Sequence, residues 1–143
     1  MITPEYIVGL VDGEGSFTVY VRNPYDYSRG VARRVKAEPR FYIKLIEKDK
    51  RILYELQKYF RCGNVYFQKD SRQHHQNCYR YEVTRRKDLQ EIITPFFSKH
   101  ALQFPSKQKD FVIFCKIMDH IYLGDHLTQK GLCKIYQLKQ DMH

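Results

Sequence analysis

The chain has 143 residues, with 25 Lys or Arg, 16 Asp or Glu, and a net charge of +9 when the histidines are neutral. A hydrophobic content of 43% suits one packed domain over residues 1–143 and excludes a wholly disordered chain. No apolar run approaches the roughly 20 residues of a membrane span. The N-terminal residues lack the pattern of a secretory leader, which predicts synthesis and use inside the cell. The spacing of the four cysteines favours neither a disulfide scaffold nor a zinc site.

The first predicted element is a helix over about residues 4–13. Thr3 supplies an N-cap hydroxyl, Pro4 occupies the first helical position, and Glu5 lies near the positive end of the helix dipole. Residues 16–22 then alternate between apolar and polar side chains, a period-two pattern that predicts a half-buried strand.

Residues 23–37 read as a long basic loop that leads to a second strand at 40–47. Asp49 is expected to cap a helix that continues to Gly63. A second hairpin follows at residues 64–69 and 77–84. The remaining helices are predicted at residues 87–94, 106–123 and 128–140. This order predicts an α+β fold in which helices cover one face of a four-stranded sheet.

The positive charge is concentrated in two segments that include the predicted strands. Residues 22–51 hold ten basic residues against four acidic ones, and residues 61–87 hold seven against two. The face of the sheet that the helices leave bare carries hydrogen-bonding side chains: Thr18, Tyr20, Arg22, Arg40, Tyr42, Lys44, Tyr66, Gln68, Arg80 and Glu82. Such side chains suit phosphates and base edges, so DNA is the predicted partner. An ordinary solvated sheet face is the alternative that this pattern leaves open.

The most specific pattern is YIVGLVDGEGSF at residues 6–17. Gly9 and Gly13 are four residues apart on one helix face, where the missing side chains let another helix approach closely. Glu14 stands between two glycines at the helix C-terminus, a place where the dipole disfavours an acid unless a cation is near. A solvated helix-end residue is the alternative interpretation of Glu14.

This segment resembles the signature helix of the LAGLIDADG homing endonucleases, with Ile7-Val8 in place of the opening Leu-Ala and Glu14 in place of the second Asp. The later blocks Pro95-Phe96-Phe97 and Ser106-Lys107-Gln108-Lys109 also resemble the family. The resemblance extends over nearly the whole chain. It implies the family's αββαββα fold, in which an antiparallel four-stranded sheet forms a DNA-binding saddle.

A single motif implies a homodimer, because two-motif members of the family form the same pseudo-symmetric arrangement within one chain. The expected interface is the paired first helices, with Asp12 bonding across it. Its residues are Tyr6, Gly9, Leu10, Asp12 and Gly13. A two-fold protein suits a roughly palindromic DNA site.

The activity that the resemblance implies is metal-dependent hydrolysis of both DNA strands during intron homing. Glu14 and the Gly13 carbonyl are the expected ligands of Mg²⁺ (or Mn²⁺), because hard cations prefer oxygen ligands. Lys107 matches the family's active-site lysine, although an exposed first-turn residue is the alternative. Glu47 stands where the family often has Gln, and it is a further catalytic candidate for holding a water at the metal site; a strand-end charge is the alternative.

The competing function is that of an intron maturase or a non-cleaving DNA-binding regulator of the same fold. A maturase adds the host-intron RNA as a partner. In each case the expected location is the compartment of the encoding intron, either an organelle or a prokaryotic cytoplasm.

Overall fold

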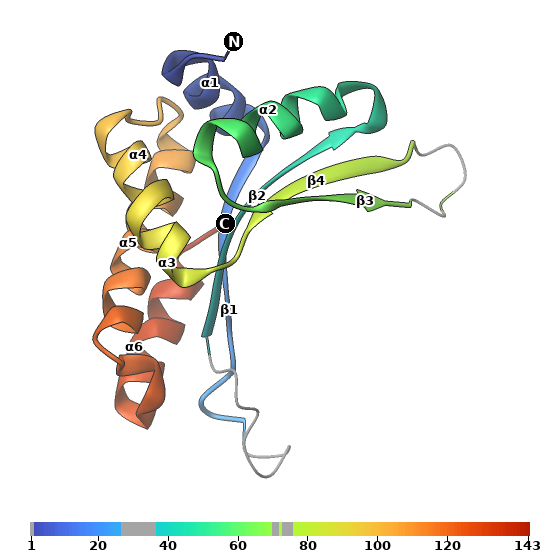
Figure 1. Cartoon of the computed structure of the whole chain (residues 1–143). Coiled ribbons are helices and arrows are strands. Elements are labelled where there is room, and N and C mark those ends of the chain that lie inside the picture. The colour runs from blue at the N-terminus through green and yellow to red at the C-terminus, as the bar shows by residue number, and fades with distance from the viewer. Residues whose placement is uncertain (1, 27–36, 70–71, 73–75) are drawn as a thin grey trace.

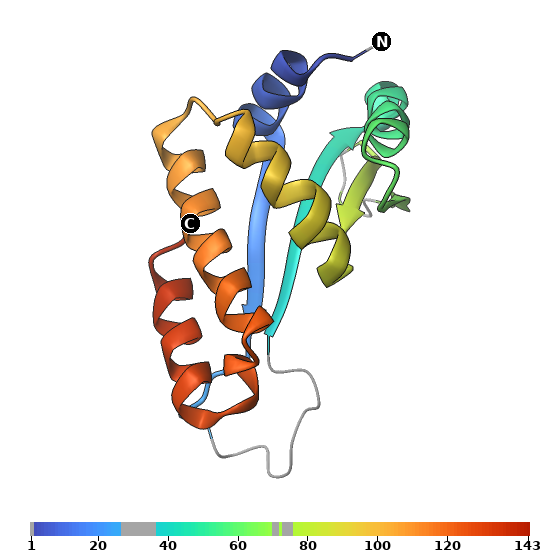
Figure 2. The same cartoon turned by 60° about the vertical axis from the view of Figure 1, so that its left-hand side comes forward.

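The computed structural model describes residues 2–26, 37–69, 72 and 76–143. Their order is helix, hairpin, helix, hairpin and further helices, as the sequence predicts. The strands form one antiparallel sheet in the order β1-β2-β4-β3 and span, in chain order, Gly15–Val21, Ala37–Ile46, Asn64–Gln68 and Cys78–Val83. The described helices gather on one side of this sheet, and its other side, here called the outer face, has no described helix over it (Figures 1 and 2). The predicted α+β class is confirmed.

The first helix, α1 (Pro4–Glu14), runs directly into β1. The Thr3 hydroxyl accepts a hydrogen bond from the Tyr6 amide at 3.2 Å, which is the predicted N-cap. Ile7 and Val11 are fully buried on the side of the helix that faces the protein. The helix extends one residue beyond the prediction, because Glu14 belongs to its last turn.

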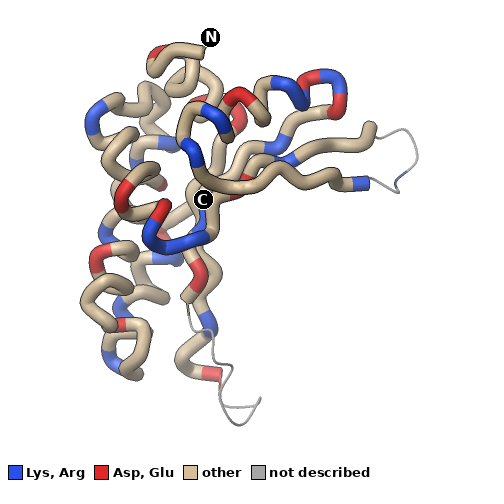
Figure 3. The backbone as a smooth tube through the Cα atoms, in the orientation of Figure 1, with Lys and Arg blue, Asp and Glu red and all other residues tan. Residues whose placement is uncertain are grey.

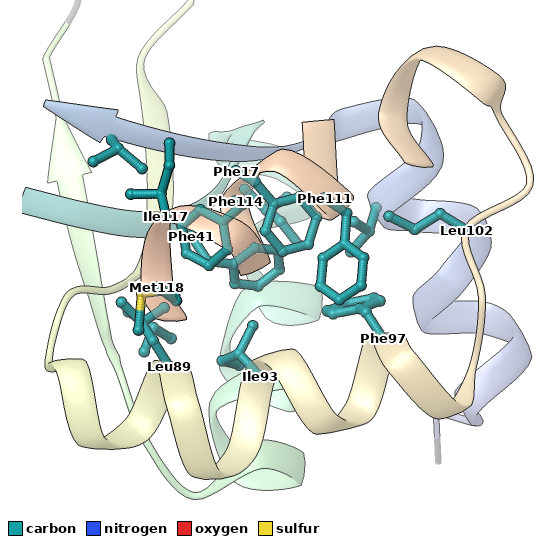
Figure 4. Close-up of a cluster of buried hydrophobic side chains, with 14 of the residues drawn as sticks. Phe17, Phe41, Leu89, Ile93, Phe97, Leu102, Phe111, Phe114, Ile117 and Met118 are labelled. Carbon is teal, nitrogen blue, oxygen red and sulfur yellow. The ribbon is translucent and has the colours of Figure 1, made fainter. Parts of the chain in front are cut away.

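An aromatic core lies between the sheet and the helices (Figure 4). Phe17 of β1 pairs with Phe41 of β2, and their ring centroids are 5.0 Å apart. The ring of Phe17 also lies 5.5 Å from that of Phe97 and 5.4 Å from that of Phe114. A register shift of one residue would turn the inward rings of a strand toward solvent, so this packing determines which face of the sheet stays bare.

The second helix, α2 (Lys50–Phe60), follows a short 3₁₀ turn, η1 (Glu47–Asp49). Asp49 occupies the N-cap position as predicted, but its side chain makes no capping hydrogen bond. The prediction that Asp49 caps this helix is therefore wrong. The reason is that the backbone of Asp49 (φ −101°, ψ 7°) is not in the extended conformation that directs an N-cap side chain onto the first amides.

The C-terminus of α2 also differs from the prediction, because the helix ends at Phe60 rather than at Gly63. Arg61 adopts a left-handed conformation, with φ 56°, and its amide closes the last turn on the Gln57 carbonyl. Gly63 serves the turn into β3 instead. It has φ 82°, and a Cβ there would lie 2.7 Å from the Tyr81 ring.

The segment after β4 is one continuous helical stretch that contains Pro95. It consists of α3 (Arg86–Asp88), a π-helical turn η2 (Leu89–Ile93) and α4 (Thr94–Lys99). The sequence predicts an end at Thr94, since proline lacks an amide donor and usually stops a helix. The structure instead places the wider π turn directly before Pro95, with the Thr94 amide bonded to the Leu89 carbonyl, and the helix continues.

The C-terminal part of the chain consists of α5 (Pro105–Tyr122), a 3₁₀ turn η3 (Asp125–Leu127) and α6 (Gln129–Gln140), close to the predicted bounds. The side chain of Gln129 donates from Nε2 to the Pro24 carbonyl at 2.8 Å, and α6 packs beside the edge strand β1. No helix in the described ranges is long and apolar enough to cross a membrane.

The first hairpin differs from the prediction in where its second strand begins. β2 begins at Ala37, three residues earlier than predicted. Most of the predicted basic loop, residues 27–36, lies outside the described residues.

Candidate nucleic-acid interface and catalytic centre

The exposed side chain of Glu14 ends α1 at the point where the chain enters β1. The next residue, Gly15, is buried, and a Cβ there would lie 2.7 Å from Val11 Cγ1. A side chain therefore does not fit at this junction unless Val11 shifts. The glycine lets α1 pass into β1 without a connecting loop and leaves the Glu14 carboxylate in solvent at the start of the sheet.

Lys107 lies in the first turn of α5, and its ammonium group donates a hydrogen bond to the Gly15 carbonyl. The side chain is half-buried. The structure thus brings a lysine that is 93 positions from Glu14 in the sequence to the residue directly after it. The ammonium group of Lys107 therefore lies one residue along the chain from Glu14. The catalytic roles of both residues remain predictions.

Asp12 has hydrogen-bond partners within its own chain. Its carboxylate accepts hydrogen bonds from the amides of Gln103, at 3.0 and 3.1 Å, and Phe104, at 3.1 Å. These are the residues just before α5, and Asp12 itself is only 5% exposed. The carboxylate thus accepts from amides that lie at the start of a helix and lack helical partners. A bond from Asp12 across a dimer remains a prediction.

Glu47 is the first residue of η1 and has an exposed side chain. Its amide donates to the Asn77 carbonyl at 3.0 Å, which holds the end of β2 against the residue before β4. Along β2 it lies four residues beyond Ile43, the pairing partner of Gly15. Among the described residues, hydrogen bonds join Lys107 but not Glu47 to the end of α1, and a catalytic role for Glu47 remains a prediction.

The thiols of Cys62 and Cys115 have raised pKa values and stay protonated near neutral pH. Burial raises the pKa of the Cys115 thiol to about 11 and raises that of Cys62 above its usual value. Thiols with raised pKa values carry little thiolate near neutral pH and are poor nucleophiles.

The strand pairing brings the predicted DNA-binding side chains together on the outer face. The register alternates, so every second residue of each strand points to this side. Directly opposed pairs on neighbouring strands are Thr18 with Arg40, Lys44 with Arg80, Tyr42 with Glu82, and Tyr66 with Arg80. Tyr20 is also exposed, near the end of β1.

The two remaining predicted residues lie at strand ends and have unsatisfied polar atoms. Arg22 follows the last residue of β1, and its Nε is buried and has no hydrogen-bond partner in the part of the chain that the structure describes. The Oε1 atom of Gln68, the last residue of β3, is in the same state. Buried polar atoms normally have partners, so these two are suited to contacts that an arriving ligand completes.

A hollow of about 680 Å³ lies over β1, β2 and β4 on the outer face, bordered by Thr18, Arg40, Tyr42 and Arg80. Lys139, from the last turn of α6, reaches the same hollow and donates to the Thr18 hydroxyl at 3.3 Å. Sequence reasoning missed Lys139, because a lysine near a helix C-terminus is ordinary and no local pattern shows that α6 packs at the β1 edge.

Basic residues are not restricted to the outer face. Figure 3 shows Lys and Arg on strands and helices alike, with acidic residues between them. Four basic residues of the first basic segment, Arg29, Arg33, Arg34 and Lys36, lie outside the described residues. What distinguishes the outer face is therefore the gathering of hydrogen-bonding side chains around one hollow.

The side of α1 that faces away from the protein has no partner within the described residues. A Cβ at Gly9 or at Gly13 would meet no atom within 4 Å, and Tyr6 on the same side is 48% exposed. Leu10 is half-buried against the core. Beside this helix a hollow of about 350 Å³ extends to His100. The two glycines thus leave an open strip along α1, wide enough for the close approach of another helix.

Comparison with known proteins matches residues 7–118 of this chain to the model of the family described as "LAGLIDADG endonuclease". The chain is 31% identical over 143 residues to "Probable intron-encoded endonuclease 2" of Neurospora crassa. It is 30% identical over 112 residues to "Probable intron-encoded DNA endonuclease 1" of Mycosarcoma maydis. These matches cover 99% and 78% of this chain but only 29% and 35% of the two relatives, so the chain spans about a third of their length.

Three solved structures are similar over almost the whole chain. The homing endonuclease I-TnaI has a TM-score of 0.81 and 33% identity, and the match covers 99% of this chain and 88% of that one. I-SmaMI bound to uncleaved DNA target in the presence of calcium ions has a TM-score of 0.81 and 31% identity. I-GzeII in complex with its DNA target has a TM-score of 0.83 and 26% identity. The match covers all of this chain in both cases, against 45% of I-SmaMI and 44% of I-GzeII.

Proposed function

Because the chain belongs to the LAGLIDADG endonuclease family, we propose that it is a site-specific DNA endonuclease that cuts both strands of a roughly palindromic target as a homodimer. The observation that carries the proposal is the contact of Lys107 with the residue after Glu14, at the start of a bare sheet face. An exposed carboxylate and an ammonium group at the start of a sheet face rich in hydrogen-bonding side chains suit metal-assisted attack on a phosphodiester.

The open strip of α1 supports a second copy of this chain as the occupant of that surface. The chain matches slightly less than half of I-SmaMI and of I-GzeII, so two copies correspond to one such molecule. Gly9 and Gly13 allow close helix contact, and Tyr6 adds apolar area beside them. A two-fold pairing through these residues would place two Glu14 carboxylates and two outer faces in one symmetric unit.

Mg²⁺ (or Mn²⁺) is the proposed cofactor, held by the Glu14 carboxylate and the Gly13 carbonyl. The donor types fit, because hard divalent cations take oxygen ligands and the last carbonyls of a helix lack helical partners. These are two ligands from one copy, and the described part of the chain holds no group of three or more His, Cys, Asp or Glu suited to a metal ion. We therefore infer that the second copy and the DNA phosphate provide the remaining oxygens. The bound cation would supply Lewis-acid activation at the scissile phosphate.

The chain's own residues have separate tasks in this proposal. The ammonium group of Lys107 offsets the negative charge that develops on the phosphate. The outer face lies in the major groove, where Arg side chains favour guanine and Gln side chains favour adenine. Both relatives are named as intron-encoded, so we propose that this chain also acts where its encoding intron resides.

The test is the substitution Glu14→Gln, assayed on DNA that spans an intron-free version of the host locus. Wild-type protein should bind in Ca²⁺ or Mg²⁺ and cut only in Mg²⁺. Glu14→Gln should still bind but lose cutting, because the metal-binding carboxylate is gone while the outer face is intact. Glu91→Gln, an equal loss of charge on the exposed helix layer, is the matched control and should bind and cut like wild type.

Two results would contradict the proposal. Cutting by Glu14→Gln at the wild-type rate would remove Glu14 from the centre. Tight binding without cutting by wild type in Mg²⁺ would favour a maturase or a non-cleaving regulator, and binding to the host-intron RNA would then identify the maturase.

A further inference from the structure

Two arginines on the outer face, Arg40 and Arg80, contact the same carboxylate oxygen of Glu82. The Oε1 atom of Glu82 lies 3.0 Å from Arg40 Nη1 and 3.2 Å from Arg80 Nη2. Glu82 and Arg80 are two residues apart on β4, and Arg40 belongs to the neighbouring strand β2. The Glu82 side chain is only 14% exposed, so its carboxylate lies below the surface between the two guanidinium groups.

Tyr42 fixes the second arginine from another direction. The Cζ atom of Arg80 lies 3.6 Å from the centroid of the Tyr42 ring, and Tyr42 is the direct pairing partner of Glu82 across β2 and β4. A planar guanidinium stacked on an aromatic ring loses its rotational freedom about the contact. Ring and carboxylate together hold Arg80 in one orientation.

Donors remain on both arginines after these contacts. A guanidinium carries five N–H donors, and each arginine gives one terminal nitrogen to Glu82. Among the described residues the Nε of Arg80 has no hydrogen-bond partner, but it is buried, so the donors that remain for DNA are those of the terminal nitrogens. Both arginines border the hollow on the outer face. A preorganised guanidinium fork matches the paired N7 and O6 acceptors of guanine in the major groove.

We propose that Glu82 is a positioning residue for sequence recognition: it holds Arg40 and Arg80 in the orientation in which their free donors read guanines of the target. This inference rests on the proposed function, because it assumes that the outer face binds DNA. The carboxylate lowers the net positive charge of the face, which costs affinity for any phosphate backbone. The same contacts fix the arginines in advance, so binding the correct base orders fewer side chains.

The experiment measures discrimination, with Ca²⁺ present so that no DNA is cut. Wild-type protein first selects duplexes from a fully randomised duplex library. Discrimination is then the ratio of dissociation constants between a selected duplex and the same duplex with its G·C pairs changed one at a time to A·T. A misfolded fraction lowers both apparent affinities equally, so this ratio does not respond to a loss of stability.

Three variants separate position from charge. Glu82→Gln removes the charge, and Glu82→Asp keeps the charge but is one methylene too short to reach both arginines. Glu38→Gln is the matched control, because Glu38 is 47% exposed and only approaches Arg40, at 3.9 Å. We expect both Glu82 variants to lose about tenfold in discrimination at one or more G·C pairs, the scale of a bidentate base contact. Glu38→Gln should bind random DNA more tightly, as Glu82→Gln should, but keep the wild-type ratio.

Either of two outcomes would overturn the inference. Unchanged ratios in both Glu82 variants would show that the arginines need no positioning. A wild-type ratio in Glu82→Asp combined with a loss in Glu82→Gln would show that the charge acts alone. Failure of the wild-type protein to enrich any sequence would instead contradict the proposed function, and it is recognised before any variant is measured.

Discussion

The two sides of α1 differ in burial: one packs against the protein and the other is open. The inner side is complete within the chain: Ile7 and Val11 are fully buried, and Asp12 binds the amides before α5. The opposite side of α1, here called its exposed side, carries Gly9 and Gly13. A Cβ added at either glycine would have no atom of the described residues within 4 Å. The inner side serves the stability of the single chain, and the exposed side is the surface that we propose for association. A substitution on each side should therefore change a different equilibrium.

Ile7→Ala should have the largest effect and act on folding. Ile7 is completely buried, and shortening such a side chain to Ala costs about 2–5 kcal/mol of unfolding free energy. Urea denaturation at a protein concentration too low for self-association measures this loss. Tyr6→Ala on the exposed side is the control and should change the unfolding free energy by about 0.5 kcal/mol or less. Equal losses for the two variants would show that both sides of α1 are buried in the single chain.

Asp12→Ala should have the next largest effect, also on folding. It leaves the amides of Gln103 and Phe104 without their acceptor, which costs about 1–3 kcal/mol. Hydrogen exchange should become faster at these two amides, and Asp12→Asn, which keeps one acceptor oxygen, should lose less. A weaker dimer with an unchanged unfolding free energy of the single chain would show instead that Asp12 acts mainly across the dimer.

Gly9→Ala should have the smallest effect on folding, with the opposite sign. Alanine favours a helix over glycine by about 1 kcal/mol, and the added Cβ meets open space in the single chain. The variant should therefore be slightly more stable when dilute, while sedimentation should show weaker self-association. Gly15→Ala is the matched control and should be destabilising, since its Cβ would lie 2.7 Å from Val11 Cγ1. A loss of stability in dilute Gly9→Ala would show that the strip is not open.

Local patterns were sufficient for most of the fold. Features that act over a few residues can be predicted from the sequence. Examples are the Thr3 cap, the alternation around Phe17 and Phe41, and the glycines of α1. The prediction failed where a distant contact or an unusual turn decided the outcome. Pro95 continues a helix because a π turn precedes it, and Asp49 does not cap because the turn before α2 sets its backbone.

The candidate site divides in the same way. The family resemblance identified Glu14 and Lys107 from their motifs, but only the fold places Lys107 against the Gly15 carbonyl. No sequence pattern indicated a role for Lys139, because its contact with Thr18 depends on where α6 lies relative to β1.

The sequence by itself determined the main element types, the inward sides of β1, β2 and β4 and the open strip of α1, because these follow from periodicity and side-chain size within short segments. On β3 the alternation misled, since Phe67 is 51% exposed while Gln68 is half-buried. Only the tertiary structure decided which charged groups meet. Three such contacts join different elements: Asp12 with the start of α5, Lys107 with Gly15, and Glu82 with both Arg40 and Arg80. Their formation depends on the register and packing that bring those elements together, and no spacing along the chain encodes that directly.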